Sequence, residues 1–140
     1  MFAQIKMTWA QAYGEWSVLA FRVVTGLVFF MHGWQKFQGG VPGVAGFLAS
    51  LSFPMPETFA VLLIAGEVVG GLALILGVWT RLASLVLVTI AIVALFTVHI
   101  ANGFFISNGG YEFILLLLVS ALTFFTWGGG KYSVDAKIGM

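Results

Sequence analysis

The stretch AGEVVGG, residues 65–71, decides the fold class, because it places the carboxylate of Glu67 among small residues inside an apolar run from Thr58 to Trp79. An ionisable group at the centre of a bilayer costs about 2.5–3.5 kcal/mol on insertion scales, so such residues face a protein interior or a cavity. We therefore expect Glu67 to have an interior partner or a functional role.

The composition is that of an integral membrane protein. Of the 140 residues, 61% are hydrophobic and 8% are charged, and the mean hydropathy is +1.08, whereas about 25% of the residues in soluble domains are charged. The net charge of +1 includes no basic block, so we expect no nucleic-acid partner. The chain has no cysteine, which excludes disulfides, thiol catalysis and iron–sulfur ligation by this chain alone. Any redox chemistry would need a cofactor from outside.

Four apolar segments approach the length of about 20 residues that a helix needs to cross the hydrocarbon core. They are Trp16–Trp34, Thr58–Trp79, Leu82–Ile100 and Tyr111–Trp127. The first is longer than the core of a signal peptide, about 7–15 residues, so we expect it to be retained as a span. The sequence thus predicts a single all-α domain over residues 1–140, an antiparallel bundle of four transmembrane helices.

The connections between these spans differ in length. Prolines break the first, Gln35–Glu57, at both ends, and residues 44–51 within it could form a short interfacial helix. The second is only Thr80-Arg81, which predicts a tight hairpin. The third, Ala101–Gly110, contains strong turn signals.

Basic residues orient the chain in the membrane, because cytoplasmic loops carry an excess of Lys and Arg. Lys6, Arg81, Lys131 and Lys137 fall on one side of the predicted bundle, and Lys36 alone falls on the other. Both termini are therefore expected in the cytoplasm.

Arg22 is the favoured partner of Glu67. At 1.5 Å per residue, Arg22 lies about two turns in from the cytoplasmic side and Glu67 lies near the midplane, a gap that an extended arginine can cover. The pair would either lock two helices together or take part in ligand binding, and both readings stay open, because removing one partner of a buried pair costs about 3–5 kcal/mol in either case.

Glycines at helical spacing predict close contacts between the spans, as small residues do in membrane helices. The candidate packing positions are Gly26, Gly33, Gly66, Gly70, Gly71 and Gly77.

A second group of polar residues lies at the outer ends of three spans. Its members are His32, Lys36, His99, Tyr111 and Glu112. A proton-handling or quinone-headgroup site needs a titratable imidazole, a carboxylate and a hydroxyl within hydrogen-bond reach, and this group contains all three.

Other interpretations of the same residues stay open, some without any functional role. Each histidine could be an interfacial residue in contact with water, or His32 and His99 could be the axial ligands of a b-type haem. His32, His99 and Glu112 could also bind a metal, but their spacing has no zinc-like signature. We predict no metal site and assign no catalytic residue.

The order of motifs along the chain resembles the DoxX family. These motifs are Arg22, Gly26, His32-Gly33-x-x-Lys36, Pro54-x-Pro56, Glu67-x-x-Gly70-Gly71, Gly77-x-x-Thr80-Arg81, His99 and Tyr111-Glu112, between about Leu19 and Val134. The positions typical of that family are Arg22, His32, Gly33, Lys36, Glu67, Gly70, Gly71, Arg81 and Glu112. The family takes its name from a subunit associated with quinone-linked thiosulfate oxidation, and other members look like accessory components of redox or detoxification systems.

The resemblance implies a small multi-pass subunit of a bacterial-type inner membrane, associated with quinone-linked electron transfer. In this hypothesis quinone is the ligand, Glu67 and Glu112 accept protons, and the partner is a larger membrane redox complex. Arg22 and Lys36 would be charge partners, and His32 or His99 would donate to the headgroup. The alternative is a non-catalytic assembly or structural subunit, packed against a larger complex or a second copy. A small transporter is less favoured, because no discontinuous helix or repeat indicates alternating access.

Overall fold

The structure, a computed structural model, describes residues 8–140, with side chains from residue 13. All regular structure in this part of the chain is helical, which confirms the all-α prediction. The α-helices are α1 (Thr8–Gly39), α2 (Val41–Ser50), α3 (Pro56–Leu76), α4 (Thr80–Ala94), α5 (Glu112–Trp127) and α6 (Val134–Ile138). A π-helical turn, η1 (Leu95–His99), and two 3-10 turns, η2 (Ile100–Asn102) and η3 (Ile106–Asn108), connect α4 to α5. Lys6, which helped to orient the chain, lies outside the described residues.

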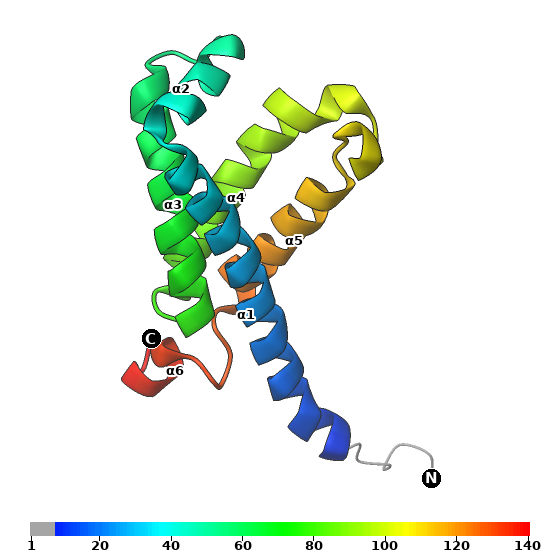
Figure 1. Cartoon of the computed structure of the whole chain (residues 1–140). Helices are drawn as coiled ribbons and strands as arrows, with labels where there is room; N and C mark the ends of the chain where they lie inside the picture. Colours follow the sequence, from blue (N-terminus) through cyan, green and yellow to red (C-terminus); the bar gives the residue numbers. More distant parts are fainter. Residues whose placement is uncertain (1–7) are drawn as a thin grey trace.

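The long helices form two neighbouring pairs, α1 with α3 and α4 with α5 (Figure 1). The two pairs meet near the end of the molecule where α6 lies. They diverge toward the opposite end, where α2 and the turns η1 to η3 lie (Figure 1). The space between the diverging pairs is where the candidate site is found.

Glycines bring the backbones of α1 and α3 into direct contact. A methyl group at Gly71 would lie 2.5 Å from the backbone nitrogen of Phe30 and 2.7 Å from the carbonyl oxygen of Gly26. A methyl group at Gly33 would lie 2.7 Å from Cβ of Glu67. Only glycine fits at such approaches, so these contacts set the register between the two helices.

The other predicted packing glycines lie elsewhere. Gly66 and Gly70 face α4, where a methyl group would meet the side chains of Ile90 at 2.8 Å and Leu87 at 3.1 Å. Gly77 is not within a helix, because its left-handed backbone (φ 68°) ends α3.

The connection between α3 and α4 is not Thr80-Arg81, as the sequence predicted. Gly77 ends α3, and Trp79, also left-handed with φ 45°, precedes the first turn of α4, which contains Thr80 and Arg81. Hydropathy missed this turn because Val78 and Trp79 are apolar.

Two further boundaries differ from the sequence prediction. Helix α1 continues beyond Trp34 to Gly39, since no helix breaker occurs before Gly39-Gly40, and Gly40 has a φ of 85°. The third predicted span is not one regular helix, because the α-helical part ends at Ala94 and η1 and η2 continue it to Asn102. Lys36 is therefore still on α1, and His99 is on a π-helical turn.

Two apolar clusters stabilise this arrangement. The main core joins both helix pairs and includes Phe29, Leu74, Leu87, Ala121 and Phe124. A smaller cluster of Ala45, Leu48 and Ala60 packs α2 against α3. Transfer of a large apolar side chain from water to such a cluster contributes about 1.5–3 kcal/mol. The smaller cluster fixes α2 beside the diverging helices.

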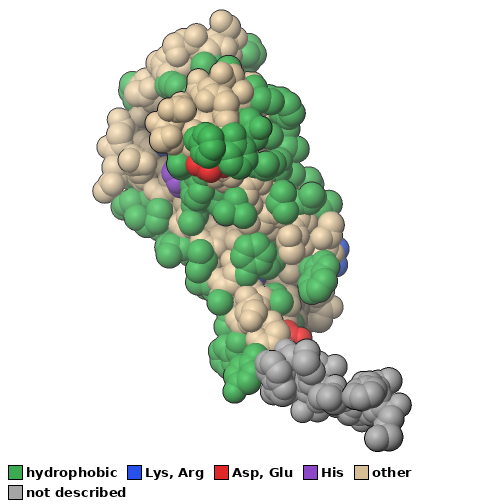
Figure 2. Space-filling model, turned by 90° about the vertical axis from the view of Figure 1, so that its right-hand side faces the viewer, with side chains coloured by type: hydrophobic (Ala, Val, Ile, Leu, Met, Phe, Trp, Pro, Cys, Tyr) green, Lys and Arg blue, Asp and Glu red, His purple; other side chains and the backbone are tan. Residues whose placement is uncertain are grey.

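Three helical segments in the described chain are long and apolar enough to cross a membrane: Tyr13–Gly39, Pro56–Leu76 and Thr80–Asn102. Helix α5 is apolar but shorter, with 16 residues. Large hydrophobic side chains are exposed along these helices, such as Val69 at 65% and Leu82 at 60%. Figure 2 shows one face on which hydrophobic side chains are common and charged ones are few. These are the features of a membrane protein whose outer surface contacts lipid.

Candidate functional site

A cavity of about 650 Å³ lies between the two diverging helix pairs. Side chains from α1, α2, α3, α4, η1 and α5 line it, and most of them are apolar. The ionisable side chains of its lining are His32, Lys36, Glu67 and His99. A largely apolar cavity with a few polar groups is the usual form of a small-molecule site.

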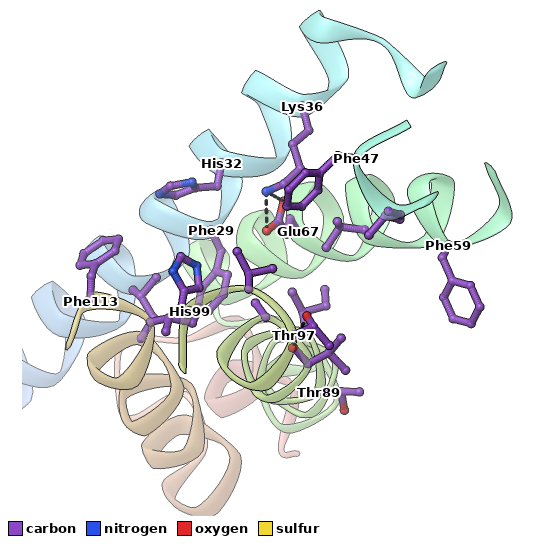
Figure 3. A pocket seen from close by; sticks show the side chains of 18 of the residues that line it. Phe29, His32, Lys36, Phe47, Phe59, Glu67, Thr89, Thr97, His99 and Phe113 are labelled. Carbon is purple, nitrogen blue, oxygen red and sulfur yellow. Dashed lines mark hydrogen bonds and ion pairs between the residues drawn. The ribbon is translucent and has the colours of Figure 1, made fainter. Parts of the chain in front are cut away.

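Glu67 and Lys36 form an ion pair on the wall of this cavity (Figure 3). The Lys36 ammonium donates to both carboxylate oxygens, at 2.6 Å and 2.9 Å. The Glu67 side chain is 8% exposed and that of Lys36 is 30% exposed. Gly33, one turn before Lys36, lets α1 approach the backbone at Glu67, so the close helix contact brings the two charges together.

The predicted pair between Arg22 and Glu67 is wrong. Contacts of Gly26 with Gly71 and of Gly33 with Glu67 set the register between α1 and α3. In this register Arg22 lies level with Ile75, whose carbonyl accepts a hydrogen bond from its guanidinium at 3.5 Å. Ile75 is eight residues beyond Glu67, which is about 12 Å along a helix. The Arg22 side chain cannot reach the Glu67 carboxylate while its guanidinium bonds to the carbonyl of Ile75.

Arg22 instead attaches the C-terminal segment to the helices. Its guanidinium donates to the carbonyls of Gly129 and, at 2.9 Å, Tyr132. Its side chain is 1% exposed. The residue is therefore part of a structural contact, which we call the C-terminal clasp: Arg22, Gly129, Tyr132, Ser133 and Asp135.

Asp135 of the clasp caps α4. Its carboxylate accepts from the backbone amides of Trp79 and Thr80 at 2.7 Å and 2.8 Å, which satisfies two amides that a helix start leaves unpaired. Burial alone would raise the pKa of Asp135, but hydrogen bonding from Thr80 and Trp79 and the charge of Arg22 together hold it below its usual value. The sequence did not indicate this role for Asp135. The one signal was the presence of an acidic residue in the polar C-terminal segment.

The two histidines enter the cavity from different elements, His32 from α1 and His99 from η1 (Figure 3). His32 lies beside Phe113, with 6.2 Å between the ring centroids. The Nδ1 atom of His99 lies 2.8 Å from the carbonyl oxygen of Gly109. Because a carbonyl only accepts, Nδ1 carries the proton, and in the neutral ring Nε2 is an acceptor.

Tyr111 and Glu112 do not line this cavity. A carboxylate oxygen of Glu112 accepts from the backbone amide of Ile106 at 2.6 Å, and the Tyr111 ring packs edge-on against Phe104 at 5.5 Å. Both residues stabilise the connection between η2 and α5. The predicted outer group is therefore divided, because His32, Lys36 and His99 share the cavity and the other two do not.

The structure adds lining residues that the sequence did not indicate. Helix α2 contributes Phe47 and Leu48, and α4 and η1 contribute the hydroxyls of Thr89 and Thr97. The helical spacing of Val44, Phe47, Leu48 and Leu51 is a signal that could have shown which face of α2 turns inward. No group of three or more His, Cys, Asp or Glu side chains able to hold a metal occurs within residues 8–140.

Comparisons with known proteins identify the family. The family model described as DoxX matches residues 17–100. The chain belongs to the DoxX family. This confirms the resemblance drawn from the order of its motifs, and the match includes Arg22, Lys36, Glu67 and His99.

Relatives of this DoxX-family chain come from two bacteria. A protein of Bacillus subtilis (strain 168) named "Putative oxidoreductase CatD" is 34% identical over 103 residues, which are 74% of each chain. A protein of Haemophilus influenzae, named only as uncharacterized, is 35% identical over 133 residues, or 91% of this chain and 94% of the relative. No solved structure matches the chain.

Proposed function

We propose that this DoxX-family protein is a bacterial inner-membrane subunit that binds a quinone or a similar apolar ring compound in the cavity and works with a redox partner. The observation that carries the proposal is the placement of Lys36, Glu67 and His99 on the wall of one largely apolar cavity. The name of the Bacillus relative, which describes an oxidoreductase, supports the redox association.

The cavity fits the headgroup of a quinone. Its volume of about 650 Å³ lies within the range of about 300–1,000 Å³ that is usual for small-molecule sites. The aromatic rings of Phe29, Phe47 and Phe113 line it, and apolar aromatic walls favour a flat ring.

The polar groups supply what the two oxygens of a quinone need. The Lys36 ammonium can donate to a carbonyl oxygen, and the Nε2 acceptor of His99 can receive the hydroxyl proton of the reduced form. Oxidation of a quinol to a quinone releases two electrons and two protons. In this proposal the partner protein accepts the electrons, and Nε2 of His99 and the carboxylate of Glu67 accept the two protons.

We propose further that α5 completes a bundle of four transmembrane helices with both termini in the cytoplasm. Arg81, Lys131 and Lys137 belong to the end of the molecule that carries α6, and Lys36 belongs to the other end (Figure 1). This distribution of basic residues supports a cytoplasmic position for the α6 end.

Extraction of bound lipids tests the ligand directly. The protein is purified in mild detergent, and the extract is analysed for quinones by mass spectrometry. Wild type is expected to retain quinone, and Glu67→Gln and Lys36→Met are expected to lose most of it. Glu57→Gln is the matched control, because Glu57 lies at the exposed start of α3 and does not line the cavity.

Absence of quinone from wild type, together with unchanged respiratory activity in a Glu67→Gln strain, would contradict the proposal. If a larger membrane protein then co-purified in fixed stoichiometry, the chain would instead be a non-catalytic assembly subunit of that complex.

A further inference from the structure

One opening of the cavity, which we call the mouth, lies between α3 and α4. The two helices are in contact where Gly66 faces Ile90 and Gly70 faces Leu87. Toward the start of α3 they separate (Figure 1). Phe59, Leu62 and Val93 lie beyond the contact, and each of them both lines the cavity and is exposed, at 40%, 58% and 39%. A side chain with both properties marks an opening.

This opening faces the lipid. Leu62 belongs to the apolar segment Pro56–Leu76, and Val93 belongs to Thr80–Asn102, two of the segments long enough to cross a membrane. Val69, two turns from Leu62 on the same side of α3, is 65% exposed, so the apolar surface continues below the opening. A molecule dissolved in the bilayer reaches this opening directly, whereas a water-soluble molecule would have to cross acyl chains.

The two histidines lie away from the mouth, and the Lys36–Glu67 pair lies between them and Phe59 (Figure 3). Figure 3 shows the rings of His32 and His99 on one side of the cavity and the side chains of Phe59 and Thr89 on the other. The hydroxyls of Thr89 and Thr97 donate to carbonyls of their own helix, at 2.9 Å and 2.7 Å. The side next to the lipid therefore presents apolar surface, and the cavity is amphiphilic from one side to the other.

We propose that the ligand is an amphiphile with a long hydrocarbon tail, which enters from the bilayer between α3 and α4. Its head lies beside Lys36 and His99, and its tail leaves through the mouth formed by Phe59, Leu62 and Val93. This inference rests on the proposed function for the head and adds the tail and the route. A long polyprenyl chain exceeds a volume of about 650 Å³, so most of it would remain in the bilayer.

Two quinone probes with the same head test the inference, one with a methyl group in place of the tail and one with a ten-carbon tail. Their dissociation constants are measured in one detergent for wild type, Leu62→Trp and Val69→Trp. Val69 is the matched control, because it is exposed on the same helix and does not line the cavity.

We expect wild type to bind the long-tailed probe more tightly than the short one. Leu62→Trp is expected to weaken the long-tailed probe about tenfold, which corresponds to displacing about two methylene groups, and to leave the short probe unchanged. Val69→Trp is expected to change neither. Val93→Trp narrows the mouth from α4 and is expected to act like Leu62→Trp, so the test does not depend on one variant.

Several outcomes would overturn the inference. If wild type bound both probes equally, or if Leu62→Trp and Val93→Trp bound both like wild type, the tail would not lie in this mouth, although the head site would stand. Equal loss of both probes in folded Leu62→Trp would place the head in the mouth and contradict the route. If neither probe bound wild type, the proposed function would fail as well.

Discussion

Helix α1 carries two basic side chains, Arg22 and Lys36, that the fold treats in different ways. Arg22 is 1% exposed and bonds to backbone carbonyls of the C-terminal segment. These carbonyls are held in place by the fold, and they cannot titrate. Lys36 is partly exposed and bonds to the side chain of Glu67 on a cavity wall, a partner that can take up a proton or exchange for a ligand. Burial of a charge therefore does not separate the structural contact from the candidate site in this protein, but the nature of the partner does.

The largest effect is expected for Arg22→Leu. This change leaves the carbonyls of Gly129 and Tyr132 and the carboxylate of Asp135 without their buried cation, at a cost of about 3–5 kcal/mol. Thermal unfolding in detergent, followed by circular dichroism, measures the loss. Arg81→Leu is the control, since Arg81 is exposed with one long contact of 3.4 Å to Phe125, and it should change stability by less than about 0.5 kcal/mol. Similar effects for both variants would remove the structural role given to the clasp.

The next largest effect is expected where α1 and α3 touch. Gly71→Ala places a methyl group against the backbone of Phe30 and Gly26, which cannot move away, so we expect a loss of about 1–3 kcal/mol. Gly66→Ala meets side chains and no backbone, the flexible end of Ile90 at 2.8 Å and Val86 at 3.3 Å, and should cost less. Comparison of the two unfolding temperatures checks the order, and an equal cost would argue against backbone contact as the determinant of register.

A pH effect is expected at the clasp. The folded pKa of Asp135 lies below its ordinary value of 3.8, so its contribution to stability is present above about pH 4 and is lost as the pH falls through the folded pKa. Asp135→Asn should remove this dependence and cost about 1–2 kcal/mol at neutral pH, because both carboxylate oxygens accept from backbone amides and the amide side chain keeps only one acceptor oxygen. Unfolding between pH 7 and pH 3 measures both. Loss of stability at acid pH that persists in Asp135→Asn, as it should in the control Glu57→Gln, would contradict the assignment.

The smallest effect is a coupling energy. A double-mutant cycle with Lys36→Met and Glu67→Gln should give about 1 kcal/mol, as expected for a partly exposed ion pair. A cycle with Arg22→Met and Glu67→Gln should give less than about 0.5 kcal/mol, because the two residues share no contact. The reverse order would restore the pairing that the sequence suggested.

The sequence was sufficient for the helical class and the family, because hydropathy and the order of motifs act over long stretches. It was insufficient to predict which side chains and carbonyls Arg22 and Glu67 contact. The depth of Arg22 was counted from a span assumed to begin at Trp16, whereas α1 begins at Thr8, and the register depends on the contact of Gly26 with Gly71. Neither quantity follows from hydropathy.

The true partners of Arg22 have no sequence signature. They are backbone carbonyls at residues 129 and 132, and any residue type can supply a carbonyl. The cavity was partly predictable, since His32, Lys36 and His99 could be placed near one end of the spans. Glu112 could not be separated from them, because its bond to the amide of Ile106 depends on the conformation of the connection between α4 and α5.

The most direct test of the account is thermal unfolding of Glu67→Gln and Asp135→Asn, each with and without the short-tailed quinone. We expect Glu67→Gln to unfold near the wild-type temperature and to lose most of the stabilisation by quinone. Asp135→Asn is expected to unfold at a lower temperature and to keep that stabilisation, because a ligand stabilises only the folded state that binds it. If both variants lost stability and quinone response together, the two charged regions would not have the separate roles assigned to them.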